Sequence, residues 1–161
     1  MFWGKLDASS TPEKIHPLRD HCLDVALTLR ALMQIESIAR RLSAETLLPA
    51  QLERLAVIAL LHDVGKCNRG FQGKRNPAAK ATAGHVLEAA ALLLDDMVQR
   101  RWPQPWSALL DQMQGWFAGG EEQLVSMLLA AISHHGRPLA FTDLTASPDR
   151  TIARWWYPPD G

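Results

Sequence analysis

Apolar residues recur at intervals of three and four along most of this 161-residue chain, which is the spacing of one face of an α-helix. No segment shows the strict alternation of apolar and polar residues that a half-buried strand requires. Glycine and proline residues separate the periodic stretches and so mark the ends of the predicted helices. The pattern therefore predicts an all-α fold, a bundle of about five helices over residues 18–42, 49–64, 82–101, 105–118 and 121–135.

The predicted helix boundaries depend on individual capping and helix-breaking residues. Pro49 suits the first turn of the second helix, and Gly65 is placed to end that helix. Thr82 is a candidate N-cap for the third helix. Between these two helices, residues 66–80 contain two glycines and a proline, and they are predicted to form a loop.

The length of the chain fits a single domain. Residues 1–138 are expected to form the helical core, because the apolar periodicity is lost beyond them. Residues 139–161 are expected to be an irregular tail, the start of a segment that is cut short here. The tail carries Trp155, Trp156 and Tyr157, which suggests an apolar surface that packs against something outside the chain.

Composition excludes several classes of function. The 17 Lys and Arg residues balance the 17 Asp and Glu residues, so any binding of nucleic acid must be local. No apolar stretch approaches the length of about 18 residues that a transmembrane helix needs, so no membrane partner is expected. Cys22 and Cys67 follow no signal peptide and lack CxxC spacing, which argues against a disulfide scaffold or a zinc finger. A cytoplasmic location is therefore expected.

The positions of the histidines are the most informative feature for function. His21 lies near the start of the first predicted helix, His62 at the end of the second and His85 in the first turn of the third. If consecutive helices run antiparallel, these three residues meet at one end of the bundle. His134 and His135 end the fifth helix, and simple alternation would place them at the opposite end. Either that pair is unrelated to the others, or the short fourth helix lies crosswise.

These histidines, together with an aspartate, indicate a metal site. A single histidine beside an apolar stripe is more often a packed core residue than a ligand. Here, however, His62 is followed by Asp63, and His134 is followed by His135. Adjacent side chains of this kind can bind metal ions at neighbouring positions. His16 is the exception, because its place before the first helix suits a surface position or an N-terminal anchor better.

A local cluster of positive charge follows the pair of His62 and Asp63. The predicted loop holds five basic residues and no acidic residue, and the basic residues are Lys66, Arg69, Lys74, Arg75 and Lys80. Taken alone, such a loop is most often a solvated surface segment. Beside a metal site, the same charges could hold a nucleic-acid strand by its backbone, independently of its sequence.

The segment LLHDVGK at residues 60–66 resembles the HD superfamily of metal-dependent phosphohydrolases. Further segments narrow the resemblance, namely WGK at 3–5, HPLRDHCLDVA at 16–26, AGHVLEAA at 83–90 and ISHHGRP at 132–138. In this order and spacing, they resemble the HD nuclease domain of the CRISPR-associated nuclease-helicase of type I systems. The resemblance spans about residues 3–138.

The resemblance implies a site for one or two divalent transition-metal ions, with Asp63 able to bridge them. Imidazole-rich ligand sets suit manganese, iron, cobalt, nickel or zinc better than magnesium. The implied ligands are three residues for each ion, His21, His62 and Asp63 for the first, and His85, His134 and His135 for the second.

The resemblance also implies catalytic and substrate-binding residues. Asp63 and Lys66 would act in catalysis, Lys66 by neutralising or positioning a phosphate. Binding of the strand would involve Lys66, Arg69, Lys74 and Arg75. The family pattern expects one more aspartate well downstream of the tandem histidines, and the aspartates of the irregular tail are not assigned to that role.

These expectations combine into a metal-dependent endonuclease or exonuclease that cleaves single-stranded DNA in CRISPR interference, an antiviral defence. Two metal ions can generate hydroxide and stabilise both the entering and the leaving oxygen, so no protein nucleophile is needed. The implied partners are single-stranded DNA, a helicase domain in the same or another polypeptide and, through it, the CRISPR surveillance complex. Two alternatives stay open, an HD phosphohydrolase acting on small nucleotides and an inactive docking module with an incomplete metal site.

Overall fold

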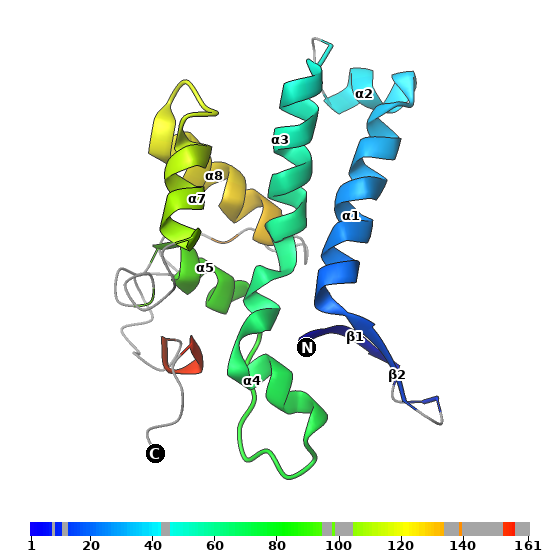
Figure 1. The fold of residues 1–161 in the computed structure, drawn as a ribbon, viewed down its shortest axis with the longest axis vertical. Coiled ribbons are helices and arrows are strands. Elements are labelled where there is room, and N and C mark those ends of the chain that lie inside the picture. Colours follow the sequence, from blue (N-terminus) through cyan, green and yellow to red (C-terminus); the bar gives the residue numbers. More distant parts are fainter. Residues whose placement is uncertain are drawn as a thin grey trace.

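The computed structural model of the chain describes residues 1–7, 9–10, 13–42, 46–94, 98, 105–133, 139 and 153–156. Helices make up most of these residues, and two short strands form a small sheet near the N-terminus (Figure 1). The predicted all-α class is therefore confirmed, with this small sheet as an addition. Among the described helices, none is both long and apolar enough to cross a membrane.

Helices α1 (Leu18–Met33) and α3 (Pro49–Leu60) lie side by side and run in opposite directions (Figure 1). The buried positions of α1 include Leu18, Cys22 and Ala26, which recur every four residues and so form one face of the helix. Because the two helices are antiparallel, the first turn of α1 and the last turn of α3 lie at the same end of the pair. This end holds the candidate site.

The first predicted helix is interrupted. Instead of one helix over residues 18–42, α1 ends at Met33 and a second helix, α2 (Glu36–Leu42), follows a two-residue turn. Ala39 of α2 and Leu52 of α3 line the same pocket, so α2 turns back over the start of α3. A straight continuation of α1 would have carried the apolar side of α2 away from this contact.

The segment after α3 is mostly helical, so the prediction of a loop over residues 66–80 is wrong for its first ten residues. Gly70 allows close packing there instead of breaking the helix. A Cβ atom added to Gly70 would lie 2.5 Å from the Cβ of Ala83. Three short helices cover the segment, η1 (Leu61–Cys67), α4 (Arg69–Gln72) and η2 (Gly73–Arg75).

The third predicted helix begins later than expected. Helix α5 (Val86–Leu94) starts after His85 and not at Thr82, because the residues before it are tied to η1. In particular, the carbonyl of Gly84 accepts a hydrogen bond from the side chain of Asn68 at 2.8 Å. The chain therefore enters α5 only after it has passed beside η1.

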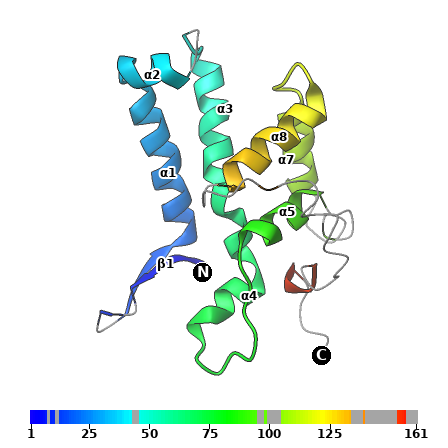
Figure 2. The ribbon, with the colours of Figure 1, turned by 180° about the vertical axis from the view of Figure 1, so that it is seen from behind.

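Helices α7 (Pro105–Gln114) and α8 (Gly120–Ile132) begin at or within one residue of their predicted starts and end a few residues before their predicted ends. Seen from behind, the C-terminal end of α8 lies beside α3 (Figure 2). Side chains of α3, η1, α5, α7 and α8 form the main core. Its buried residues are Ile58, Leu61, Ala89, Ala90, Leu93, Met113, Leu124, Leu128, Leu129 and Ile132.

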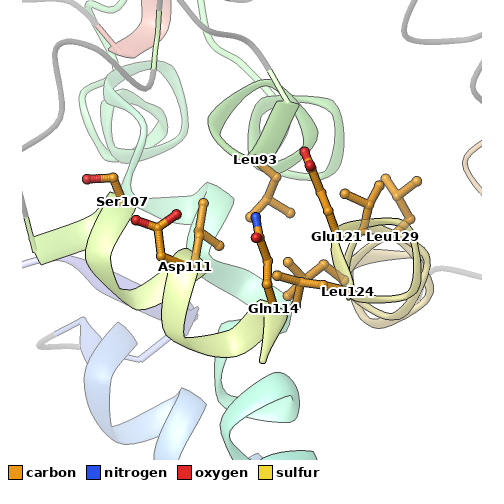
Figure 3. A pocket seen from close by; sticks show the side chains of 10 residues that line it. Leu93, Ser107, Asp111, Gln114, Glu121, Leu124 and Leu129 are labelled. Atoms are coloured by element: carbon orange, nitrogen blue, oxygen red, sulfur yellow. The ribbon is translucent and has the colours of Figure 1, made fainter. Parts of the chain in front are cut away.

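A pocket of about 110 Å³ lies between α5, α7 and α8 (Figure 3). Leu93 and Leu124 contribute apolar walls, and Asp111 and Gln114 of α7 contribute polar groups. None of the described histidines lines this pocket, so it is separate from the part of the candidate site that they form.

The strands β1 (Trp3–Asp7) and β2 (Lys14–Pro17) pair antiparallel, contrary to the prediction that the chain has no strand. They are too short for a period of two to stand out in the sequence. Asp7 helps to turn the chain after β1, since its carboxylate accepts a hydrogen bond from the backbone N–H of Ser9 at 3.1 Å. The sheet leads directly into α1 and brings the N-terminus to the candidate site.

The short helix η3 (Ala153–Trp156) packs on α4 and α5. The indole N–H of Trp156 donates to the carbonyl of Glu88 at 3.0 Å, and the ring of Trp155 lies against Gly70. The two tryptophans therefore use part of their apolar surface within the chain, and both remain half-buried. Packing against something outside the chain stays a prediction. Tyr157 lies outside the described residues.

Candidate metal centre

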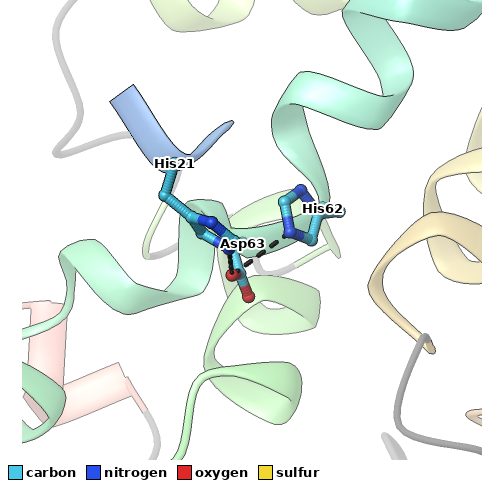
Figure 4. Close-up of side chains that lie close together, drawn as sticks. All are labelled: His21, His62 and Asp63. Atoms are coloured by element: carbon cyan, nitrogen blue, oxygen red, sulfur yellow. Dashed lines mark hydrogen bonds and ion pairs between the residues drawn. The ribbon is translucent and has the colours of Figure 1, made fainter. Parts of the chain in front are cut away.

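Asp63 is the centre of a buried cluster of histidines (Figure 4). Its side chain is 2% exposed, and its Oδ2 lies 2.9 Å from Nε2 of His21 and 3.2 Å from Nε2 of His62. One ligand atom from each of these three residues lies within 4.8 Å of the other two. Side chains from two helices that are distant in sequence thus present two imidazoles and a carboxylate to one point.

Two further groups approach the same carboxylate. The ammonium of Lys66 lies 2.6 Å from Oδ2 of Asp63, and Nε2 of His85 lies 3.2 Å from its other oxygen, Oδ1. The two oxygens of Asp63 therefore face different histidines, since Oδ2 faces His21 and His62 and Oδ1 faces His85. A carboxylate placed in this way can serve two neighbouring cation positions.

The geometry follows from the path of the chain. His21 occupies the first turn of α1. His62 and Asp63 lie at the start of η1, directly after the antiparallel helix α3. His85 immediately precedes α5, and its carbonyl accepts the backbone N–H of Ala89 at 2.9 Å. The structure thus brings His21, His62 and His85 to one end of the bundle, as the antiparallel arrangement predicts.

The tandem histidines His134 and His135 lie outside the described residues. Helix α8 ends two residues before them, and its described residues contact η1. Ile132, the last residue of α8, is 1% exposed and belongs to the core that includes Leu61 of η1. The end of α8 therefore lies beside the helix that carries Asp63.

The ring of His62 is oriented by the backbone. Its Nδ1 lies 2.7 Å from the carbonyl of Ala59, which can only accept a hydrogen bond, so Nδ1 carries the proton and donates it. Nε2 is the ring atom that faces Asp63 and the one that is placed to bind a metal ion. A backbone carbonyl in this position is the usual partner of a metal-binding histidine, because it sets both the tautomer and the orientation of the ring.

Burial and hydrogen bonding act in opposite directions on the pKa of Asp63. Burial raises the pKa, but hydrogen bonds from His62, His85 and Lys66 outweigh it and hold the pKa well below its usual range. Burial also lowers the pKa of His21, although the nearby Asp63 partly opposes this shift. At neutral pH the cluster therefore offers an ionised carboxylate and a neutral His21 imidazole, the forms that bind metal ions.

The N-terminal strand completes the wall of the cluster. The ammonium of Lys66 donates to the carbonyl of Gly4 at 3.2 Å. Gln72 links Trp3 to η1, since its side-chain amide donates to the carbonyl of Trp3 at 3.0 Å and to that of Lys66 at 2.8 Å. The WGK segment thus contributes to the site through its backbone and through the packing of Trp3.

Asn68 and Gln72 were missed by the reasoning from sequence. Asn68 accepts a hydrogen bond from the backbone N–H of Phe71 at 2.8 Å and so caps α4. Asparagine is a preferred N-cap, so this role could have been predicted if a helix had been expected there. The contacts of Gln72 join residues 69 positions apart, and no local pattern signals them.

Beyond Lys66 of η1, three of the basic residues lie on α4 and η2, and they differ in their partners. The ammonium of Lys74 lies 4.4 Å from the centre of the Phe71 ring, and that ring stacks edge-on to His85. Arg69 donates to the carbonyl of Arg154 at 3.4 Å. Arg75 is paired with the carboxylate of Glu13 at 2.7 Å. Arg75 therefore has a neutralising partner on the surface.

The remaining candidates contribute no ligand atom to the group of His21, His62 and Asp63. His16 is half-exposed and lies 3.0 Å from a carboxylate oxygen of Asp24, in agreement with the expectation of a surface position. Cys22 and Cys67 are both free, as predicted. Burial raises the pKa of each thiol to about 11.

The donor set fits a divalent transition-metal ion. The three nearest groups are two imidazoles and a carboxylate, and a third imidazole faces the other oxygen of Asp63. Such mixed nitrogen and oxygen ligands suit zinc, manganese, iron, cobalt or nickel. His21, His62 and Asp63 would hold one ion, and Asp63 with His85 would contribute to a second.

Comparison with known proteins identifies a family. Residues 3–156 of the chain match the family model described as Cas3, HD domain. No curated protein matches the chain, and neither does any solved structure. The matched range contains every residue of the cluster and extends through η3.

Proposed function

Because the chain belongs to the family of Cas3 HD domains, which are metal-dependent phosphohydrolases of the HD superfamily, we propose that it is a nuclease that cleaves single-stranded DNA. The observation that carries the proposal is the convergence of His21, His62, His85 and Lys66 on the carboxylate of Asp63. A phosphodiesterase of this kind requires an ionised carboxylate beside a neutral imidazole, and Asp63 and His21 would supply these forms.

Each residue of the cluster would have a separate role in cleavage. When bound, divalent ions supply a hydroxide at neutral pH and stabilise the charge that develops on the phosphodiester. Asp63 would hold both ions, because its two oxygens face different histidines. Lys66 would position a phosphate oxygen beside Asp63, since its ammonium is kept there by Asp63 and the carbonyl of Gly4.

The protein itself does not need to supply a nucleophile. Cys22 follows His21 in α1 and is the thiol nearest to it in sequence. Burial raises its pKa to about 11, so the thiol stays protonated and weakly nucleophilic at neutral pH. This property favours attack by activated water over a covalent intermediate on the chain.

The choice of single-stranded DNA as substrate rests on the family. The ammonium groups of Lys66 and Lys74 lie over the ring of Phe71, and Arg69 lies on the same short helix as Phe71; these three residues would contact the phosphates of a strand without reading its bases. We further propose the partners that the family implies, a helicase domain and, through it, the CRISPR surveillance complex. The setting would be antiviral defence in the cytoplasm.

Cleavage of circular single-stranded DNA tests the proposal directly. The chain is stripped of metal, reloaded with manganese, cobalt or nickel, and compared with the Asp63→Asn variant. Metal-dependent opening of the circle by the unmodified chain alone is the expected result. If a nucleotide panel releases nucleoside or phosphate while the circle stays intact, the small-nucleotide phosphohydrolase is correct instead. If metal is retained and neither substrate is cleaved, the chain is an inactive docking module.

A further inference from the structure

Asn68 is a completely buried polar residue that lies between two segments of the cluster. Its side-chain amide donates to the carbonyl of Gly65 at 2.7 Å and to the carbonyl of Gly84 at 2.8 Å. Gly65 lies two residues after Asp63, and Gly84 immediately precedes His85. One amide group thus joins the backbone that carries the carboxylate to the backbone that carries the third histidine.

From this arrangement we propose that Asn68 is a positioning residue, which sets the separation of His85 from Asp63 and thereby the second metal position. The inference rests on the proposed function only in assigning a metal ion to His85. The separation itself, 3.2 Å from Nε2 of His85 to Oδ1 of Asp63, is a property of the chain without metal.

The close approach of the two segments shows why a bridging amide is needed. A Cβ atom added to Gly65 would lie only 1.7 Å from the carbonyl oxygen of His85. The two backbones are therefore nearly in contact, and the carbonyls of Gly65 and Gly84 both point at the same amide nitrogen. Without the side-chain amide, the carbonyl of Gly84 would lose this hydrogen bond, and the buried carbonyl of Gly65 would keep only the backbone N–H of Asn68 at 3.2 Å. The segment that carries His85 would then lose its attachment to η1.

The capping role of Asn68 can be separated from its bridging role. The side-chain oxygen accepts from the N–H of Phe71 and caps α4, whereas the side-chain nitrogen makes the two bridges. Asn68→Asp has almost the same shape and keeps the capping oxygen, but it replaces both donated hydrogens with an acceptor. The change also adds a buried carboxylate, so Asn68→Ser, which keeps a capping oxygen and adds no charge, is measured beside it.

The test compares Asn68→Asp with Asn76→Asp in the full chain. Asn76 is the matched control, since it lies in an exposed turn where its side-chain oxygen accepts from Ala78 at 3.0 Å. The first measurement is the ring ¹⁵N and ¹H chemical shifts of the histidines in the metal-free, isotope-labelled chain. The second is a titration with cobalt, followed by absorption spectroscopy and calorimetry.

We expect Asn68→Asp to shift the ring signals of His85 while those of His16 stay unchanged. It should also weaken the binding of the second cobalt ion by about 10- to 100-fold, the usual effect of losing an outer-shell partner, with the first ion affected less. Asn76→Asp should change neither measurement. If Asn68→Asp behaves like Asn76→Asp in both, the proposal is wrong.

Two other outcomes are also decisive. If Asn68→Asp does not fold, Asn68→Ser takes its place, because serine caps the helix but is too short to bridge both carbonyls, and unchanged His85 signals in that variant would overturn the proposal. If the unmodified chain binds no second ion, the two-ion form of the proposed function fails. The His85 signals of the metal-free chain then still decide whether Asn68 positions that residue.

Discussion

The ammonium of Lys66 lies 2.6 Å from Oδ2 of Asp63, three residues earlier in the same 3₁₀-helix. A 3₁₀-helix has three residues per turn, so side chains at positions i and i+3 lie almost directly above one another. The spacing of the HDVGK segment therefore holds a cation against the buried carboxylate. This pairing leaves Oδ1 to face His85 and contributes to the ionised state of Asp63.

Asp63→Asn should remove most of the bound metal, because one residue faces all three histidines of the cluster. The loss of metal affinity should exceed the roughly 10- to 100-fold that is typical of an outer-shell partner. Elemental analysis after dialysis measures the metal, and cleavage of circular single-stranded DNA measures activity. Asp111→Asn, an exposed position on α7, is the control and should match the unmodified chain. Normal metal content in Asp63→Asn would contradict the assignment.

Gly65→Ala should destabilise the chain strongly, since the new Cβ atom would lie 1.7 Å from the carbonyl oxygen of His85. Overpacking against backbone costs about 3 kcal/mol of unfolding free energy or more. Gly73→Ala is the matched control, because it has open space around it and helical backbone angles. That variant should be neutral or more stable by about 0.4–1 kcal/mol. Urea unfolding of both variants measures the difference, and equal stabilities would be inconsistent with the close approach.

Part of this site could be predicted from sequence, because it follows from helical periodicity. The positions of His21 and His62 on antiparallel helices place them at one end. The helical pairing of Lys66 with Asp63 was not predicted, because Lys66 was assigned to a loop whereas η1 continues through it. The link between Asn68 and Gly84 could not be predicted, because it depends on where an irregular segment passes η1. The same holds for β1, whose Trp3 is held by Gln72 across 69 positions.

Stability of the metal-free chain should fall as the pH drops below the ordinary pKa of histidine, about 6.5. Burial lowers the pKa of His21 in the folded state, so between that lowered value and 6.5 the unfolded chain binds the additional proton. Protonation therefore stabilises the unfolded state in this window, and the contribution is absent above it. His21→Asn should lose less stability than the unmodified chain between pH 7.0 and 5.5. Urea midpoints at the two pH values, in the presence of chelator, make the comparison, and identical losses would argue against a buried neutral His21.

Both thiols should react slowly with a thiol reagent in the folded chain. Burial raises the pKa of Cys22 and of Cys67 to about 11, so only about 0.1% of each is thiolate at pH 8. Labelling should be about 100-fold slower than in the chain unfolded by urea, and its rate should rise nearly tenfold per pH unit up to pH 9.5. A folded chain that reacts as fast as the unfolded one would show that neither thiol is buried.

Lys74→Gln should weaken the binding of single-stranded DNA and reduce the slope of log affinity against log salt concentration by about 1, because one phosphate contact releases about one counterion. Arg75→Gln serves as the comparison. Arg75 is already paired with Glu13 at 2.7 Å, so forming a phosphate contact would require breaking that pair, and its removal should change the slope less. Fluorescence anisotropy with a labelled oligonucleotide at several salt concentrations measures both slopes, and metal content should be the same in the two variants. Equal slopes in Lys74→Gln and the unmodified chain would mean that the strand does not pass over η2. The charge of Lys74 would then interact only with the Phe71 ring and the carboxylate of Glu88.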